Sequence, residues 1–237
     1  MGHELLKLRG GADTIQSIYY ATAIGDIAQL GERGVRNAEV GGSSPPISTT
    51  GSMKIGLIAD TQVPSAELSP KVKVAFEGID LILHAGDILI PSCLDFLEEI
   101  ATVKAVETGA ERQFTGDSRV AEHDRVVEAE GHSIGMVHEL AIPSISALEI
   151  LSGVIAKSFP SDASLPDAIE QIFGAPVDIV LYGFTHIPLI EEHEGILFIN
   201  PGSATWPNQR VMPGTVAILD LSPDRRNAWI VDLSKLD

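Results

Sequence analysis

The feature that most constrains the fold is an apolar run, from Met53 to Gln62, that ends abruptly on a carboxylate. Its near-continuous apolar character is typical of a strand buried on both faces of a sheet. Asp60 comes where the strand stops, and α/β folds place their ligands at the carboxyl edge of the sheet. Asp60 is therefore the first candidate functional residue, although an aspartate here can also simply cap a turn or a helix.

Two further apolar runs end in the same way. The run over residues 80–85 ends on Gly86-Asp87, and the run over residues 177–182 leads into Gly183-Phe184-Thr185-His186. Parallel strands bring their carboxyl ends to one edge of a sheet, so we expect Asp60, Asp87 and His186 to lie close together. Carboxylate and imidazole donors in one place suggest a metal site.

From Met53 onward, strands and helices alternate and are then followed mostly by strands. The first strands and helices predict a right-handed βαβαβ unit. The full pattern predicts an α/β fold of two facing mixed β-sheets flanked by helices. Helices are expected over residues 69–77, 91–100, 147–156 and 165–173. Strands are expected over residues 53–59, 80–85, 102–108, 125–130, 132–138, 177–182, 188–192, 196–199, 214–221 and 227–233.

Residues 1–52 differ in composition from the rest of the chain. They are rich in glycine and end in a Gly, Ser, Pro and Thr segment that is typical of a linker. Residues 27–50 also resemble the conceptual translation of a transfer-RNA gene. We therefore predict a disordered or spurious extension over 1–52 and a domain over 53–237, with Met53 as the natural initiator. An ordinary flexible extension is the alternative.

Composition excludes several functions. The 33 acidic and 16 basic side chains give a net charge of −17, which repels phosphate backbones and argues against general nucleic-acid binding. Cys93 is the only cysteine, so disulfides within the chain and thiolate zinc sites are excluded. No apolar run is long enough to span a membrane, and no signal-peptide pattern is present, so we expect a cytoplasmic protein. Nucleotide-binding and serine-hydrolase motifs are lacking.

Six short motifs, taken in order, resemble those of the calcineurin-like metallophosphoesterases, and especially the small bacterial and archaeal phosphodiesterases. They are Asp60-x-Gln62, Gly86-Asp87, Gly109-Ala110-Glu111, His138-Glu139, Gly183-Phe184-Thr185-His186 and Asn200-Pro201-Gly202-Ser203. The resemblance implies a four-layer sandwich of two sheets between helices. It also implies two divalent metals, commonly manganese, that share one bridging carboxylate.

By this resemblance, Asp60 and His186 match ligands of the first metal and Asp87 matches the bridging carboxylate. Gln62 replaces a first-metal histidine and is a weak oxygen ligand at best. His138 matches a ligand of the second metal.

Two other ligand positions of the second metal are substituted. Ala110 stands in place of an asparagine and Phe184 in place of a histidine. Glu111 stands where related enzymes often carry a histidine general acid, but an exposed loop glutamate is usually only solvated. We assign no catalytic residue. We therefore expect one divalent cation, manganese first and zinc, iron or magnesium as alternatives, held by Asp60, Gln62 and the other first-metal ligands.

Two functions remain open from the sequence. The first is a metal-dependent phosphoesterase, acting on phosphodiester small molecules, whose activity is weakened or lost because three of seven ligand positions are substituted. The second is a non-catalytic module that binds a protein partner, as is known for a phosphoesterase-like subunit of the retromer coat. Retention of Asp87 favours the first, and the substitutions at positions 62, 110 and 184 favour the second.

Overall fold

The computed structural model describes residues 52–62, 68–107, 112–205 and 213–237. The expected extension, apart from Ser52, lies outside the described residues, and so do Ala110 and Glu111. All described residues belong to one compact unit, Thr49–Asp237.

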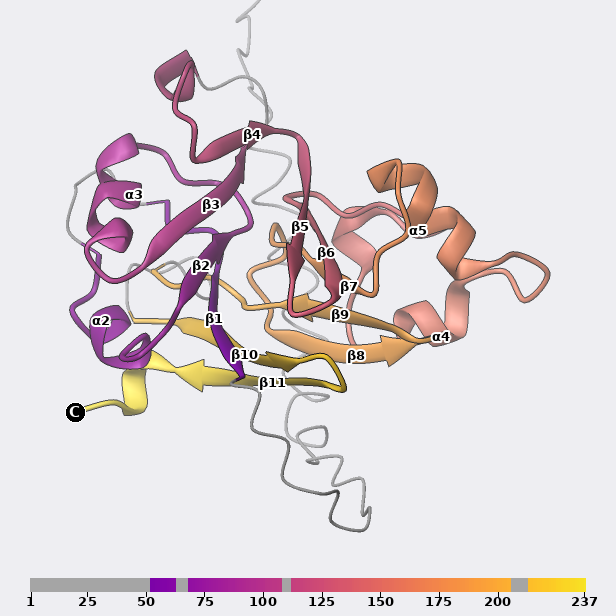
Figure 1. The fold of residues 1–237 in the computed structure, drawn as a ribbon. Coiled ribbons are helices and arrows are strands. Elements are labelled where there is room, and N and C mark those ends of the chain that lie inside the picture. The colour runs from indigo at the N-terminus through magenta and orange to yellow at the C-terminus, as the bar shows by residue number, and fades with distance from the viewer. Residues whose placement is uncertain (1–51, 63–67, 108–111, 206–212) are drawn as a thin grey trace, which may run out of the picture. The chain divides into compact units, whose positions relative to one another are not determined.

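The first sheet is built around three parallel strands that begin at Met53. Its strand order is β11-β10-β1-β2-β3-β4 (Figure 1), with β4 also parallel and β10 and β11 antiparallel. Ile58 pairs with His84, so β1 and β2 end level with each other. The strands are β1 (Met53–Ile58), β2 (Leu81–His84), β3 (Thr102–Glu107), β4 (Val120–Glu122), β10 (Thr215–Ser222) and β11 (Arg225–Asp232).

The second sheet has a parallel centre and two antiparallel edges. Its order is β5-β6-β7-β9-β8, and β6, β7 and β9 run parallel. This sheet is therefore mixed, as the sequence predicted. The strands are β5 (Asp124–Ala129), β6 (His132–Val137), β7 (Ile179–Leu181), β8 (Leu189–His193) and β9 (Ile196–Asn200).

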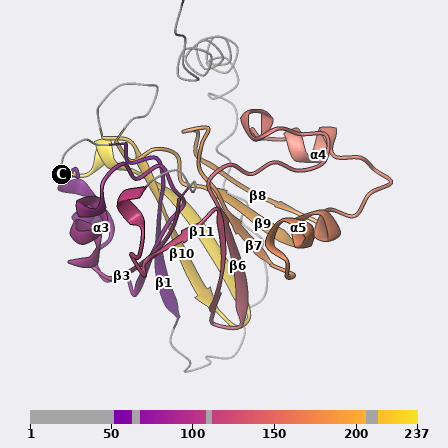
Figure 2. The same cartoon turned by 90° about the horizontal axis from the view of Figure 1, so that it is seen from above.

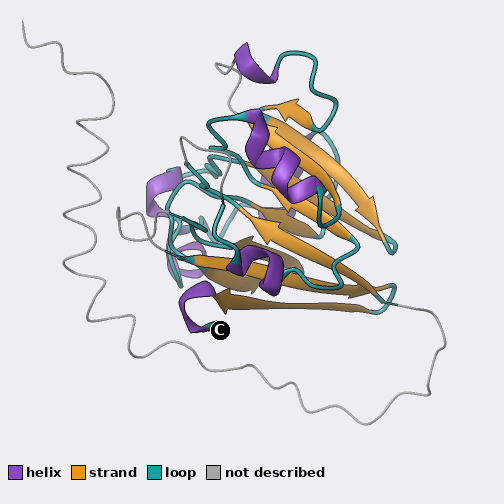
Figure 3. Cartoon of the chain, turned by 90° about the vertical axis from the view of Figure 1, so that its left-hand side faces the viewer, coloured by secondary structure: helices purple, strands orange, loops and turns teal. Residues whose placement is uncertain are grey.

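The sheets face each other across a shared core, with helices on both outer faces. Leu57 and Leu83 of the first sheet belong to one buried cluster with Met136 and Leu181 of the second. Figure 2 shows α3 beyond the first sheet and α4 and α5 beyond the second, and Figure 3 shows the same layering from another side. The predicted two-sheet α/β sandwich is confirmed. The helices are α2 (Lys71–Ala75), α3 (Pro91–Glu98), α4 (Val154–Ser158) and α5 (Leu165–Phe173).

Local sequence signals explain one correct helix and one wrong one. The helix α5 has the predicted bounds, because Ser164 caps its N-terminus and Gly174 ends it in the left-handed conformation. The single helix predicted over residues 147–156 is wrong. The chain instead forms a 3-10 turn, Ala147–Glu149, and starts α4 only after Gly153, whose φ of 76° no regular helix contains.

Candidate metal centre

The candidate site lies where the carboxyl ends of strands from both sheets meet. Asp60 follows β1 and Asp87 follows β2 in the first sheet, while His138 follows β6 and His186 follows β7 in the second. The structure therefore brings together side chains that are up to 126 positions apart in the sequence (186 minus 60). Gln62, two residues beyond Asp60, lies at the same edge.

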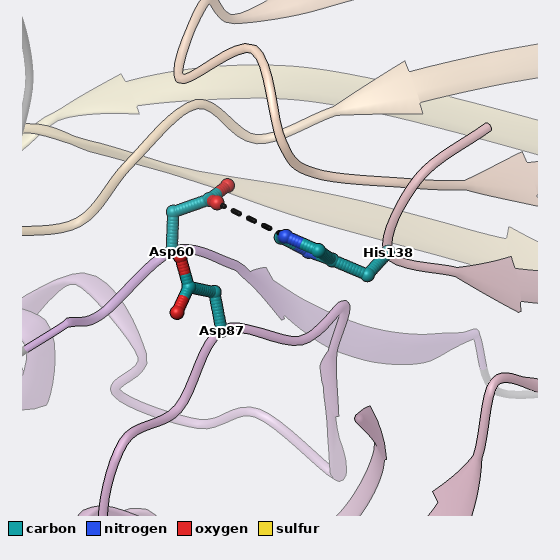
Figure 4. A group of neighbouring side chains, drawn as sticks. All are labelled: Asp60, Asp87 and His138. Atoms are coloured by element: carbon teal, nitrogen blue, oxygen red, sulfur yellow. Dashed lines mark ion pairs between the residues drawn. The ribbon is translucent and has the colours of Figure 1, made fainter. Parts of the chain in front are cut away.

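Asp60, Asp87 and His138 form a group whose ligand atoms all lie within 4.8 Å of one another (Figure 4). The Nε2 atom of His138 is 3.8 Å from Asp60 Oδ1, and the Nε2 atom of His186 is 3.3 Å from the same oxygen. The Gln62 side-chain amide donates a hydrogen bond to Asp87 Oδ2. All five residues expected from the sequence as ligands thus lie in one cluster.

Hydrogen bonding fixes the orientation of the His138 ring. Its Nδ1 lies 2.8 Å from the carbonyl oxygen of Ala85, which can only accept a proton, so Nδ1 carries the hydrogen. The other ring nitrogen, Nε2, faces Asp60, as Figure 4 shows. This is the arrangement found in metal-binding histidines, in which the second ring nitrogen donates to a carbonyl or carboxylate and orients the ligating one.

The backbone that carries these side chains is locally strained. Five residues of the cluster and its neighbourhood have positive φ, where side chains other than glycine are uncommon. They are Asp60 (50°), Gln62 (38°), Asp87 (56°), Phe184 (72°) and His186 (57°). Backbone bonds hold this conformation, from Asp60 N to Gly86 O at 3.0 Å and from Gln62 N to Asp87 O at 3.2 Å. Strain of this kind collects at functional sites.

Two glycines make room for the convergence. A Cβ atom at Gly86 would lie 2.8 Å from the Cβ of His138, and one at Gly183 would lie 2.8 Å from Asp60 Oδ2. Carbon atoms do not approach so closely without displacement. Glycine at both positions therefore lets His138 and Asp60 reach the same point.

The electrostatics of the site favour a cation. Burial raises the pKa of the Asp87 carboxyl, although the Gln62 amide and the nearby His138 oppose this shift. Asp60 is fully buried, and the carboxylate accepts the backbone N–H of Phe184 at 3.1 Å. A divalent cation among these groups would stabilise both ionised carboxylates and lower the pKa of Asp87.

Phe184 places a hydrocarbon ring beside one of the candidate ligands. Its ring meets the His138 ring edge to face, with centroids 5.7 Å apart and an angle of 85° between planes. A phenyl ring has no lone pair for a metal, so Phe184 packs against His138 but cannot act as a ligand. The second substituted position, Ala110, lies outside the described residues.

Several supporting residues were not singled out from the sequence. His84 is fully buried beneath the site and contacts Thr61, and the Glu107 carboxylate accepts the backbone N–H of Ile88 at 3.0 Å. Ser203, in contrast, belongs to the Asn200-Pro201-Gly202-Ser203 motif recognised in the sequence, and it donates to the carbonyl oxygen of Asp60 at 2.7 Å. The only available signals were a histidine inside the apolar run before Gly86 and a glutamate at the end of the third strand.

Comparison with known proteins places this architecture in a family. Residues 53–224 match the calcineurin-like phosphoesterase superfamily domain. The chain belongs to this family. A probable metallophosphoesterase of Methanothermobacter thermautotrophicus is 30% identical over 181 residues, which cover 76% of this chain and 92% of that protein. A probable metallophosphoesterase of Methanocaldococcus jannaschii is 29% identical over 160 residues, covering 66% of this chain and 71% of that protein.

Solved structures agree with the fold. A predicted phosphoesterase from Streptococcus pneumoniae has a TM-score of 0.50 at 20% identity, covering 78% of this chain and 92% of its own. Vps29 of Chaetomium thermophilum, in complex with a cyclic peptide, has a TM-score of 0.51 at 19% identity, covering 76% of this chain and 95% of its own. Identities this low establish the fold alone. Among the described residues, no helix is long and apolar enough to cross a membrane.

Proposed function

We propose that this chain is a metal-dependent phosphoesterase that acts on phosphodiesters through a single divalent cation. The observation that carries the proposal is the convergence of Asp60, Asp87 and His138, whose ligand atoms lie within 4.8 Å of one another at the seam of the two sheets. His186 and Gln62 complete the donor set. Family membership supports the reaction class. The cluster supports the proposed location of the active site.

The residues fit a cation of moderate hardness. Two carboxylates, two imidazoles and one amide are a mixed oxygen and nitrogen set, which suits manganese, iron or zinc, and we propose manganese. Such a cation, when bound, lowers the pKa of water and stabilises negative charge on a phosphoryl group. The orientation of His138, whose Nδ1 bond to Ala85 turns Nε2 towards Asp60, is the feature that best supports this assignment.

The side chains of this chain then have separate tasks. Asp60 is held by the Phe184 N–H and aims its carboxylate at both histidines. Asp87 lies half-buried opposite it, and Gln62 is close enough to hold one Asp87 oxygen in place. Phe184 shields one side of His138 from water.

The substitutions argue for one cation and for weak activity. A second cation would have to share Asp87 and His138 with the first, because neither Ala110 nor Phe184 offers a donor. Loss of one cation of a pair removes part of the charge stabilisation that drives phosphoryl transfer. The same substitutions support the second candidate, a module that binds a protein partner without catalysis. The net charge of −17 fits a small-molecule substrate or a cytoplasmic protein partner better than a nucleic acid.

Two measurements on the purified full chain test the proposal. Calorimetry with manganese should show about one site per chain, and hydrolysis of bis(4-nitrophenyl) phosphate should require the metal. Asp87→Asn is the matched variant, because it keeps the size of the side chain and its contact with Gln62 but removes a charge. Loss of binding and activity in this variant supports the proposal. If the chain binds manganese but hydrolyses nothing, the protein-binding module becomes the better hypothesis. If the chain binds no manganese, the proposed metal site is refuted.

A further inference from the structure

We infer that His84 and Thr61 form a brace beneath the site that sets the spacing between its two carboxylates. The brace joins the loop after β1 (residues 59–62) to the loop after β2 (residues 85–90). These are positioning residues: neither belongs to the donor set. Their effect on metal binding rests on the proposed function, whereas the brace itself is a property of the metal-free chain.

The geometry gives His84 one contact on each loop. Its Nδ1 accepts the backbone N–H of Gly86 at 3.1 Å, and its Nε2 lies 3.1 Å from the hydroxyl oxygen of Thr61. Gly86 directly precedes Asp87, and Thr61 directly follows Asp60. A single imidazole therefore links the neighbours of both carboxylates.

The hydrogen-bond directions are fully determined. Since Nδ1 of His84 accepts, the ring proton lies on Nε2 and is donated to the Thr61 hydroxyl. That hydroxyl can then donate its own proton to the carbonyl oxygen of Asp87, 3.5 Å away, while accepting from the Cys93 thiol at 3.4 Å. Complete burial lowers the pKa of His84 to about 3, so the ring keeps this neutral form over the ordinary pH range.

The two loops that the brace joins have strained backbones, so they need contacts that hold their conformation. Asp60 and Asp87 both have left-handed backbones, which a free chain would leave for more favourable conformations. From the other side, Thr205 donates to the carbonyl oxygen of Thr61. Thr61 is thus bonded to His84 through its hydroxyl and to Thr205 through its carbonyl oxygen. These two contacts fix the position of the backbone that carries the Asp60 side chain.

The competing explanation is that His84 is only a core residue that supports folding. Both explanations expect a lower melting temperature after substitution. Only the brace hypothesis predicts that loss of either His84 contact, to Gly86 or to Thr61, will by itself weaken metal binding. Asparagine can reproduce the Nδ1 acceptor and glutamine the Nε2 donor, whereas phenylalanine fills the space with neither.

The experiment measures manganese affinity and amide hydrogen exchange in full-length His84→Asn, His84→Gln, His84→Phe and Thr61→Val. We expect His84→Phe to weaken manganese binding by about 10- to 100-fold, as loss of outer-shell partners does elsewhere. His84→Asn and His84→Gln should fall between it and the natural chain. Thr61→Val should weaken binding, and Thr61→Ser should restore it.

A remote core variant separates positioning from stability. Ile169→Ala lies on α5, over the other face of the second sheet, and should lower the melting temperature without changing manganese affinity. If His84→Phe weakens binding no more than Ile169→Ala does, the brace is refuted.

Hydrogen exchange covers the case in which the natural chain binds no manganese. The brace then still requires faster exchange at the amides of Asp60, Gln62 and Gly86 in His84→Phe than in Ile169→Ala. Equal exchange refutes it. Faster exchange retains it, although the proposed function has failed.

Discussion

His138, at the end of β6, donates its Nδ1 proton to the carbonyl oxygen of Ala85, at the end of β2, over 2.8 Å. This bond crosses from one sheet to the other. It also decides which ring nitrogen faces Asp60, so the packing of the two sheets and the chemistry of the site depend on the same contact.

We predict that His138→Asn will separate these two roles. The asparagine amide can still donate to Ala85, but nothing replaces the Nε2 atom. The melting temperature of the metal-free protein should fall by only a few degrees, whereas manganese affinity should drop at least tenfold. His138→Ala, which removes both contacts, should lower both quantities. Calorimetry and thermal unfolding measure them, and unchanged affinity in His138→Asn would remove this residue from the donor set.

Asp87→Asn should stabilise the metal-free protein at neutral pH. Burial raises the pKa of Asp87 in the folded state, so ionising it costs folding free energy once the pH rises above the ordinary carboxyl value. Asparagine avoids that cost and can still accept a hydrogen bond from Gln62. The gain in unfolding free energy should be largest near pH 7 and disappear towards pH 3. A chemical denaturation series across this range checks the sign, and a loss of stability at pH 7 would contradict the argument.

Acid should destabilise the natural chain through His84. Its folded-state pKa is lowered from 6.5 to about 3, so between these values the unfolded chain binds more protons. Stability from this group is therefore present above pH 6.5 and lost as the pH falls, by up to about 1.4 kcal/mol per pH unit. Burial is the main cause of this lowered pKa, and the nearby Asp60 carboxylate opposes it. His84→Asn should show a shallower decline between pH 6.5 and 4, and an identical slope would exclude His84 as the cause.

Restoring the family ligands should restore a second cation. The variant Gln62→His, Ala110→Asn and Phe184→His replaces all three substituted positions. It should bind two manganese ions and hydrolyse bis(4-nitrophenyl) phosphate much faster, because each 1.36 kcal/mol of regained barrier lowering is about tenfold in rate. The single variants should rescue poorly, since ligands of one site act as a unit. Circular dichroism must first show that the variant folds. Two bound metals without hydrolysis would favour the protein-binding module.

The candidate ligands that directly follow strands can be predicted from the sequence. The apolar runs before Asp60 and Asp87 are long and uninterrupted, so their ends mark the sheet edge reliably. The structure agrees, with β1 and β2 ending level there. The predicted ligand set thus converges, and whether it binds a metal stays a prediction.

Other features depend on contacts that local patterns do not encode. The strand β4 has only three residues and pairs with β3 alone. Three residues are too few to show the alternation of apolar and polar side chains that identifies a strand in a sequence. The parallel pairing of β6 with β7 joins residues separated by the whole of α4 and α5. His84 belongs to an apolar run, and only the fold shows that both of its ring nitrogens are bonded.

The position of the site on the seam between the sheets also has a consequence for how the protein matures. During synthesis, Asp60, Gln62 and Asp87 leave the ribosome long before His138 and His186, so a growing chain offers only three of the five donors. A cation that binds only the closed seam adds its binding free energy to the docking of the two sheets, about 2.7 kcal/mol at a hundredfold excess over its Kd. A chain with the cation bound would then resist unfolding better than the metal-free chain.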